Sequence, residues 1–263
     1  MKLHLPGKYF IAGLLLVAVA VVLIAIALLT NRGDITTAAV VISGMICAVT
    51  GIFILTFSGD EPINTGLIGN LSVQDLMNIC RIQSDLGITG TAHFLPPRVT
   101  GETRVMLFNP VSTYTGGHVE PTDSFPLSGP AGMVTVPSCD PLLQDLKKST
   151  TLPDTKNTEE MTRLLQEIIS GIFEVASDVS ASWQGDTVTV MFHGYRFIGG
   201  CNVIARESPR CCSMHPCAAC SLCGALIAGS MDTVVSLDRC SPDASSQDIT
   251  AVFTLLPAPD IHP

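Results

Sequence analysis

Two long apolar runs open the chain, and one short polar segment separates them. Residues 9–30 and 35–57 contain no charged side chain, and each run is long enough to cross the roughly 30 Å of hydrocarbon in a bilayer as a helix. Helices of a soluble core usually keep a polar stripe, whereas neither run has one. The pattern therefore predicts a transmembrane helical hairpin over residues 1–57, in which Gly44, Ala48 and Gly51 let the helices pack closely.

A linker and one soluble domain are expected after the hairpin. Residues 58–72 are rich in turn-forming residues and predict the linker, which leaves residues 73–263 for a domain with its own core. Ser72 and Asp75 resemble a capping box, so we expect a helix to begin there and to end at Gly87.

Short strands that run into prolines dominate the first half of the domain. Residues 89–96 and 102–110 each carry an aromatic residue shortly before a final proline, which predicts a β-hairpin. Residues 110–131 are rich in Pro, Gly, Ser and Thr without an apolar period, so we expect a long loop. Residues 133–137 then predict a brief strand, and Asp140 begins a short helix with a proline in its first turn.

Helical and strand periods alternate in the second half of the domain. Apolar residues recur first at helical spacing and then at every second position, and this change of period repeats once. In chain order, the expected elements are a helix, two strands, a helix and two strands, at residues 158–177, 179–183, 188–192, 216–230, 233–237 and 249–256, with a glycine-rich loop before the second helix. This α-β-β-α-β-β order, behind a transmembrane hairpin, predicts an α+β domain.

The soluble part is acidic, and this bears on its partners. The whole chain has a net charge of −9 at pH 7. Residues 58–263 carry 11 basic and 22 acidic side chains, whereas binding to phosphate backbones needs a basic surface. We therefore expect no nucleic-acid partner, and we expect anionic lipid headgroups to repel this surface.

The charges that flank the apolar runs set the expected orientation. Lys2 and Lys8 precede the first run, one arginine and one aspartate balance each other in the turn, and no Lys or Arg follows until Arg81. The positive-inside rule then places the amino terminus and the soluble domain in the cytoplasm, below a cell membrane crossed twice. The ten cysteines are scattered in a domain large enough to fold without disulfides, so we expect a reducing compartment.

The sharpest local signal is a group of sulfur and imidazole side chains close together in the sequence. Cysteines spaced as CxxCxxC can surround a zinc ion or an iron–sulfur cluster. The candidate metal ligands are Cys211, Cys212, His215, Cys217, Cys220 and Cys223. Either Cys201 or Cys240 could complete a set of four.

Two other interpretations of the same cysteines stay open. Cys217, Cys220 and Cys223 are spaced along a predicted helix of small apolar residues, where cysteine is a common core residue. Cys217 also falls in the first turn of that helix, where free N–H groups and the helix dipole favour a thiolate. A reactive thiol is therefore the third interpretation.

A small-molecule site is expected between the two predicted helices of the second half. Small residues of the helix at 216–230 face bulky residues of the helix at 158–177, and such surfaces either interlock or leave a cavity. An apolar ligand in that cavity would contact Ile168, Ile172, Phe173, Ala218 and Ala225. No P-loop, GxSxG, HExxH or Rossmann glycine pattern occurs, so an enzyme is the less favoured class.

Three short motifs stand out, namely Phe94-Leu95-Pro96, Leu107-Phe108-Asn109-Pro110 and His215-Pro216 before the small-residue helix. With them, nearly the whole chain resembles a family of uncharacterised archaeal membrane proteins from methanogens and halophiles. Members of that family have two amino-terminal helices and one soluble α+β domain. The resemblance implies this architecture and brings no known activity.

A more distant resemblance covers residues 158–256. Their order of a long helix, a hairpin, a cysteine-containing helix and a final hairpin is similar to the vinyl-4-reductase-type small-molecule-binding domain, in which these elements enclose a ligand pocket. Cys217 and Cys240 match cysteines of that domain in order. The cysteine usual in its last strand is missing between Asp248 and Phe253.

Three functional hypotheses follow from these observations. The first is a membrane-anchored small-molecule-binding or sensor domain, and the second is a structural or assembly protein with a membrane protein partner. The third is a metal or redox protein that uses the cysteines of residues 211–223. An apolar cavity favours the first hypothesis, a large exposed apolar patch the second, and bound metal the third.

Overall fold

The computed structural model describes residues 8–30, 35–57, 69–121, 124–125, 129–243 and 245–256. These segments belong to two compact units, Met1–Ile63 and Asn64–Pro263. The turn expected at residues 31–34 and most of the expected linker, residues 58–68, lie outside the described residues.

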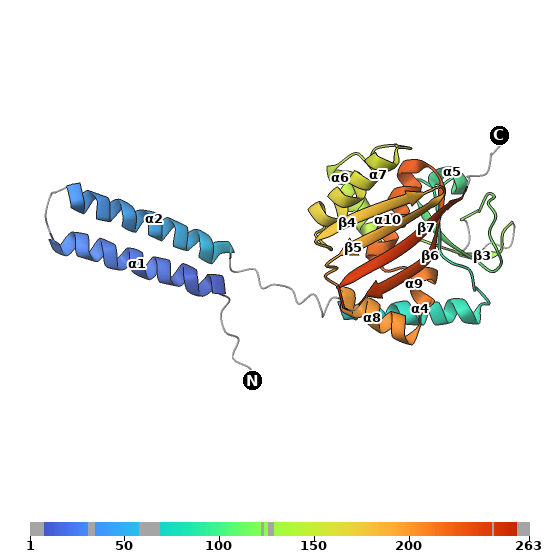
Figure 1. Ribbon diagram of the computed structural model, residues 1–263, viewed down its shortest axis with the longest axis horizontal. Coiled ribbons are helices and arrows are strands. Elements are labelled where there is room, and N and C mark those ends of the chain that lie inside the picture. Colours follow the sequence, from blue (N-terminus) through green and yellow to red (C-terminus); the bar gives the residue numbers. More distant parts are fainter. Residues whose placement is uncertain are drawn as a thin grey trace. The chain divides into compact units, whose positions relative to one another are not determined.

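The first unit is a pair of apolar helices, α1 (Lys8–Thr30) and α2 (Ile35–Phe57), which pack along each other (Figure 1). Within them, Ile11–Thr30 and Ile35–Thr56 are long and apolar enough to cross a membrane. Most of their large apolar side chains face outward, as expected where lipid surrounds a helix. The two predicted amino-terminal apolar helices are therefore confirmed.

Glycines allow the close approach of these two helices. A Cβ atom on Gly51 would lie 2.8 Å from Val17 Cγ2 and 3.0 Å from the Gly13 carbonyl oxygen. A Cβ atom on Gly44 would lie 3.1 Å from Ile24 Cγ1. Side chains larger than hydrogen would push the helices apart, so Gly44 and Gly51 lie on the packed face of α2, as the sequence predicts.

The second unit is built on one seven-stranded sheet whose neighbouring strands are all antiparallel. The strands are β1 (His93–Leu95), β2 (Met106–Pro110), β3 (Gly132–Thr135), β4 (Asp178–Gln184), β5 (Thr187–His193), β6 (Val234–Asp243) and β7 (Asp248–Leu256). Their order in the sheet is β3-β2-β1-β6-β7-β5-β4. The last hairpin of the chain therefore joins the two earlier strand groups, and the predicted α+β class is confirmed.

Alternating burial gives the β4, β5 and β7 part of the sheet one covered and one open face, whereas β1 and β2 are buried on both faces. On β5, Val188, Val190 and Phe192 are buried, while the residues between them are only partly buried. The register pairs Val190 with Ala251 of β7, which is also buried. Both strands therefore direct apolar side chains to the same face, which becomes the floor of the core.

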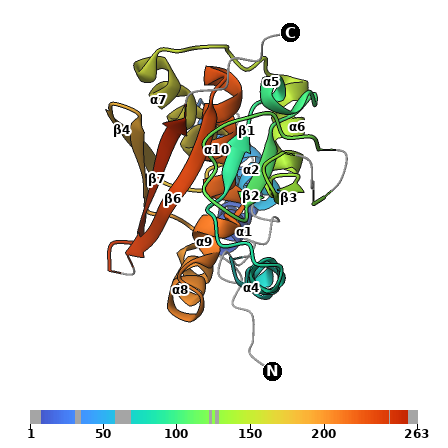
Figure 2. The ribbon, with the colours of Figure 1, turned by 90° about the vertical axis from the view of Figure 1, so that its right-hand side faces the viewer.

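Helix α10 (Ala218–Met231) lies on this covered face, beside α6 (Asp140–Ser149) and α7 (Thr158–Gln166) (Figure 2). By length and composition, Cys211–Met231 is a third candidate for a membrane span. However, 83% of the most apolar 18-residue stretch within it is buried inside the unit. A helix that is apolar on all sides suits a protein core as well as lipid. Burial identifies α10 as the central core helix.

Two helices occupy the stretch that was expected to be a glycine-rich loop, so that prediction is wrong. They are α8 (Ile198–Glu207) and α9 (Cys211–Met214), which contact α4 (Val73–Asp85) at one end of the domain (Figure 1). Gly200 of α8 packs directly on the chain at Gly69, where an added Cβ would overlap the Gly69 carbonyl oxygen. This glycine serves close packing rather than chain flexibility.

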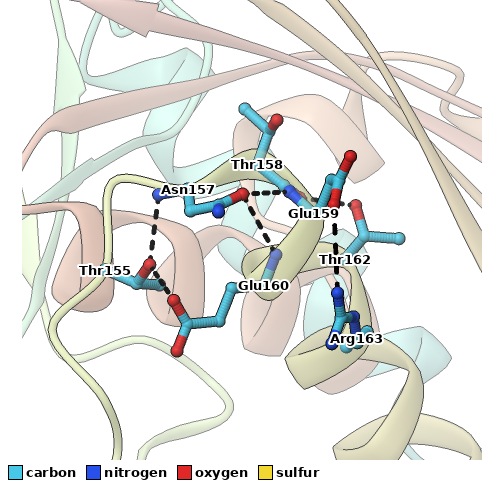
Figure 3. Close-up of polar contacts among 7 residues, drawn as sticks. All are labelled: Thr155, Asn157, Thr158, Glu159, Glu160, Thr162 and Arg163. Atoms are coloured by element: carbon cyan, nitrogen blue, oxygen red, sulfur yellow. Dashed lines mark hydrogen bonds and ion pairs between the residues drawn. The ribbon is translucent and has the colours of Figure 1, made fainter.

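Side-chain capping fixes the start of α7 (Figure 3). Asn157 Oδ1 accepts hydrogen bonds from the backbone N–H groups of Glu159 and Glu160, at 2.9 and 3.5 Å. Glu160 Oε2 accepts a further bond from Thr155 Oγ1 at 2.6 Å. Because the first N–H groups of a helix have no partner inside it, these contacts explain why the helix begins at Thr158.

The helix predicted over residues 158–177 ends earlier and changes its pitch. Beyond α7 the chain forms a π-helix, η1 (Glu167–Ile172), whose wider turn moves later side chains around the axis. Ile169 is fully buried, whereas Ile172 is 48% exposed, although an α-helical period places both on one face. The predicted inward position of Ile172 is therefore wrong.

Four smaller features of the second unit are the start of α4, the turn between β1 and β2, the helix at Asp140 and the end of β6. Ser72 flanks α4 but makes no side-chain cap bond, and a short helix, α5 (Pro97–Thr100), fills the turn between β1 and β2. The short helix predicted at Asp140 is present as α6. Strand β6 continues to Asp243, six residues beyond the predicted end at Leu237, because a β-bulge after Leu237 lets its pairing with β7 resume.

Candidate functional site

An apolar cavity of about 380 Å³ lies at the amino-terminal end of α10. Its walls come from α4, α6, the chain after η1, the chain after β5, α8 and α10 itself. Most of the wall is aromatic or aliphatic, as at Phe173, Val175, Phe197, Ile204 and Leu222. The cavity therefore offers an apolar molecule a surface that is built from many separate parts of the chain.

Tyr195 organises the aromatic wall. Its ring packs edge-on against Phe192 and Phe197, with ring centroids 5.8 Å apart in both pairs. Its backbone N–H donates to the Gln247 carbonyl oxygen at 2.8 Å, which ties this stretch to the turn between β6 and β7. Tyr195 is 4% exposed, so this part of the wall is packed against its neighbours and cannot collapse into the cavity.

Five free thiols extend from this cavity into the domain, and we call them the thiol row. Cys217 Sγ lies 3.9 Å from the Tyr195 hydroxyl at the cavity wall. Deeper in the domain, Cys220 Sγ lies 3.7 Å from Cys240 Sγ. Hydrogen bonds link the remaining neighbours, and in order the thiol row is Cys201, Cys217, Cys220, Cys240 and Cys212.

Hydrogen bonds within the thiol row separate the acidities of its members. A hydrogen bond from the Cys201 thiol holds the pKa of Cys217 well below its ordinary value, against the opposing effect of burial. The single S–H of Cys220 can donate either to Cys217 or to Cys240. A bond from the Cys212 thiol, joined by one from Cys220 when its S–H points to Cys240, lowers the pKa of Cys240 to about 5. The three donors have raised pKa values, chiefly because each donates to one of these sulfurs. A thiolate therefore forms most readily at Cys217, beside the cavity, and at Cys240.

The predicted ligand contacts fall in different places. Phe173 and Ala218 line the apolar cavity. Ala225, two turns further along α10, lines a different cavity of about 330 Å³. Ile168 is 2% exposed in the core, and Ile172 faces outward. The cavity thus lies at the end of η1 rather than along its middle, because the π-helical turn redirects the last side chains.

The predicted metal ligands do not form one group. Cys212, Cys217 and Cys220 belong to the thiol row, whereas Cys211 is bonded to Cys80. His215 is buried, its Nδ1 has no hydrogen-bond partner among the residues that the structure describes, and burial lowers the pKa of its imidazole. Cys223 is fully buried in the main core cluster. Within the described parts of the chain, no three His, Cys, Asp or Glu side chains meet in a way that could hold a metal ion.

A disulfide between Cys80 and Cys211 joins α4 to α9, with the two Cα atoms 5.7 Å apart. The two cysteines are 131 positions apart, so no local spacing in the sequence indicates this pairing. The expectation of a domain without disulfides is corrected here.

Three wall residues of the cavity were missed because they lie in the stretch expected to be a loop. They are Tyr195, Phe197 and Ile204. A signal was present, since Ile198, Cys201 and Ile204 are spaced at three-residue intervals directly after two aromatic residues. That spacing is typical of one helix face, but the glycine pair between them outweighed it.

Away from the thiol row, three polar side chains contact one another on the open face of β4, β5 and β7. Ser180 Oγ is 3.3 Å from His193 Nε2, and His193 Nδ1 is 3.3 Å from Asp248 Oδ2. The Gly194 N–H donates to Asp248 Oδ1 at 3.0 Å and holds the pKa of that carboxyl below its ordinary value. Ser, His and Asp occur in this order in hydrolytic triads, but Ser180 is exposed on a strand and neither cavity described above reaches it. We interpret these contacts as links between β4, β5 and β7.

A comparison with curated proteins found no match, and a comparison with solved structures found none. A family model described as a domain of unknown function, DUF7982, matches residues 7–203. The match covers both apolar helices and the domain as far as α8, including Cys201 but no other member of the thiol row. Because the matched stretch is well over half of the sequence, the chain belongs to the DUF7982 family.

Proposed function

We propose that this protein is a membrane-anchored module that binds a small apolar molecule in the cavity at the start of α10. The cavity itself is the observation that carries the proposal, with its volume of about 380 Å³ and its mainly aromatic and aliphatic walls. Ligand sites commonly enclose about 300–1,000 Å³ and combine apolar walls with a few polar groups. Here the polar side chains among the wall residues are those of Ser72, Tyr195, Cys201 and Cys217.

A bilayer anchor suits such a ligand. Apolar molecules partition into lipid, so a protein held at a membrane meets them at a higher local concentration than a freely diffusing one. The lipid bilayer is then the partner of α1 and α2. The net charge of −9 speaks against nucleic acid as a second partner.

We place the amino terminus and the domain in the cytoplasm as part of the proposal. Lys2 and Lys8 support this orientation, whereas the Cys80–Cys211 disulfide opposes it because disulfides are rare in reducing compartments. An amine reagent that cannot cross membranes decides between them. Lys148, whose side chain is 75% exposed, should be labelled only after cells are made permeable. Labelling of Lys148 in intact cells would show that the domain lies outside the cytoplasm and would contradict the proposed orientation.

The resemblances noted in the sequence also support a membrane-anchored domain that binds a ligand. The archaeal membrane-protein family supports the two-helix anchor, and the vinyl-4-reductase-type domain supports a ligand enclosed by helices and hairpins. In that comparison Cys217 matches a cysteine of the ligand-binding domain, and here it lines the cavity. These similarities concern architecture, and they leave the identity of the ligand to experiment.

The assembly hypothesis has less support. Among the described residues of the domain, the large apolar side chains that are clearly exposed are Leu71, Ile82, Leu86, Val136 and Ile172. Ile82 and Leu86 are neighbours at the end of α4, and the other three lie on different segments. Scattered apolar residues are normal on a soluble surface, whereas docking sites present continuous patches.

Filling the cavity tests the proposal. Ala218 is the first residue of α10 and lines the cavity, so Ala218→Phe should occupy the space that a ligand would use. The full chain would be released from detergent micelles into a native mass spectrometer with the neutral apolar probe N-phenyl-1-naphthylamine. We expect one probe molecule per chain in the wild type and in the control Ala218→Ser, and none in Ala218→Phe. Equal uptake by all three proteins would show that the probe binds elsewhere.

A further inference from the structure

We propose that Cys217 and Cys220 form a reactive dithiol that reduces a small apolar disulfide held in the cavity. The proposal builds on the ligand cavity and adds a reaction to it. Its substrate class is a low-molecular-weight organic disulfide with apolar substituents.

The two cysteines have the placement that thiol–disulfide exchange requires. Cys217-Ala218-Ala219-Cys220 is a CxxC sequence at the start of a 14-residue helix. Cys217 is the N-cap residue, is half-buried and lines the cavity, whereas Cys220 is 1% exposed one turn further on. The outer sulfur can therefore meet a substrate, while the inner sulfur can react only with its neighbours.

Three further features of the surroundings support the outer sulfur as the nucleophile. The amino-terminal end of α10 favours negative charge at Cys217 through its free N–H groups. The Tyr195 hydroxyl lies 3.9 Å from Cys217 Sγ and can donate to it. The Cys201 thiol donates to the same sulfur and also lines the cavity. A thiolate at Cys217 is thus stabilised by donors from three different elements.

The reaction consumes one substrate disulfide and one protein dithiol. The Cys217 thiolate attacks one sulfur of the substrate, a mixed disulfide forms, and the first substrate thiolate leaves with a proton taken from water. The Cys220 thiol then loses its proton to the second departing thiolate and attacks Cys217 Sγ. The products are two substrate thiols and a Cys217–Cys220 disulfide. The substrate gains two electrons, and the protein dithiol loses them.

The cavity wall selects the substrate class. The described residues that line it include no Lys or Arg side chain, so an anionic disulfide would lose its hydration without gaining a partner. The aromatic wall at Phe173, Tyr195 and Phe197 instead suits uncharged ring or chain substituents. We therefore expect an uncharged disulfide to react faster than an anionic one of similar size.

The test counts the thiols released from a chromogenic disulfide. Full-length protein would be purified without oxygen, with the Cys80–Cys211 bond intact, and in a Cys47→Ala background because Cys47 is a partly accessible thiol of α2. The uncharged probe is 4,4′-dithiodipyridine, and the anionic comparison is 5,5′-dithiobis(2-nitrobenzoate). Absorbance follows the released thiol, and peptide mass spectrometry locates the bonds that form.

The expected results differ between variants. The unmodified dithiol should release two pyridinethiones per chain in a fast phase and end with a Cys217–Cys220 disulfide. Cys220→Ser should release one and keep a pyridylthio group on Cys217. Cys217→Ser should lose the fast phase and react at least roughly tenfold more slowly, because the remaining thiols are buried apart from the partly exposed Cys240, which is not among the described residues that line the cavity. Cys223→Ala, one turn beyond Cys220 in the core, should keep the fast phase.

Several outcomes would overturn the proposal. They are a fast phase that survives in Cys217→Ser, two thiols released from Cys220→Ser, or zinc or iron near one per chain that is lost in Cys217→Ser. Circular dichroism of each variant, with the wild-type spectrum as reference, shows whether the variant is folded. Probe uptake in the Ala218 series without a fast thiol phase would remove the dithiol chemistry while leaving the ligand-binding proposal in place.

Discussion

Cys211→Ala should lower the free energy of unfolding of the domain by about 2–5 kcal/mol when no reductant is present. The substitution removes the disulfide to Cys80, and the two partners are 131 positions apart. A cross-link over so long a stretch strongly limits the unfolded chain. In the folded domain it joins α4 to α9 inside a buried cluster that includes Val73, Leu76 and Met214. Denaturant unfolding followed by the fluorescence of the single tryptophan, Trp183, measures the change.

Reduction of the wild type is the matched control, because it breaks the bond and leaves both side chains in place. Reduced wild type and Cys211→Ala should unfold at similar denaturant concentrations. The double variant Cys80→Ala/Cys211→Ala should lose little more, since both substitutions remove one shared interaction. An unchanged midpoint in Cys211→Ala without reductant would show that the bond does not stabilise the protein.

Gly224→Ala should destabilise the domain by about 1–3 kcal/mol, the usual cost of an added methyl group in a filled core. Gly224 lies in the middle of α10, and a Cβ atom there would overlap the ring of Phe94 on β1. Phe94 is fully buried, so its ring has no free space to enter. The clash would force α10 away from the sheet at the centre of the core. Thermal and denaturant unfolding of the full chain measure the loss.

Two further variants show whether the clash is the cause. Gly199→Ala is the control, because the same change in α8 meets no atom of the described residues within 4 Å. It should leave stability unchanged or raise it by about 0.4–1 kcal/mol. Phe94→Leu removes Cε2 and Cζ, two of the three ring atoms that the methyl group added at position 224 would meet. The pair Gly224→Ala/Phe94→Leu should therefore be less damaging than the sum of its single changes. Strict additivity would contradict this packing account.

The sequence predicts best where one strong physical demand acts on a long stretch. The apolar runs of α1 and α2 follow from length and lack of charge, and the small residues at Gly44 and Gly51 follow from helix packing. The hairpin of β4 and β5 follows from strict alternation on both sides of Gly185. In these stretches the local sequence pattern and the tertiary environment favour the same structure, so the pattern alone is enough to predict it.

The candidate site could be predicted only in part, because it depends on contacts between distant segments. A glycine pair in α8 has the signature of a loop, but Gly200 is required by packing on Gly69. The π-helical turn of η1 moves Ile172 outward, and a 3.6-residue period has no means to show this. Cys240 joins the thiol row from β6, twenty residues after Cys220. Phe173 and Ala218 were predicted to face a ligand because a bulky residue lies opposite a small one, and both residues line the cavity.

The most direct test of the central claim is the thermal stability of the full chain with and without an apolar ligand. Circular dichroism would follow unfolding in detergent at a concentration of N-phenyl-1-naphthylamine about a hundred times its dissociation constant, where binding adds about 2.7 kcal/mol of stability. For a domain of this size the wild-type midpoint should rise by roughly 5–10 °C. Ala218→Ser should show the same rise, and Ala218→Phe should show none. Equal shifts in Ala218→Phe and wild type, or no shift in either, would contradict a ligand site in the cavity at the start of α10.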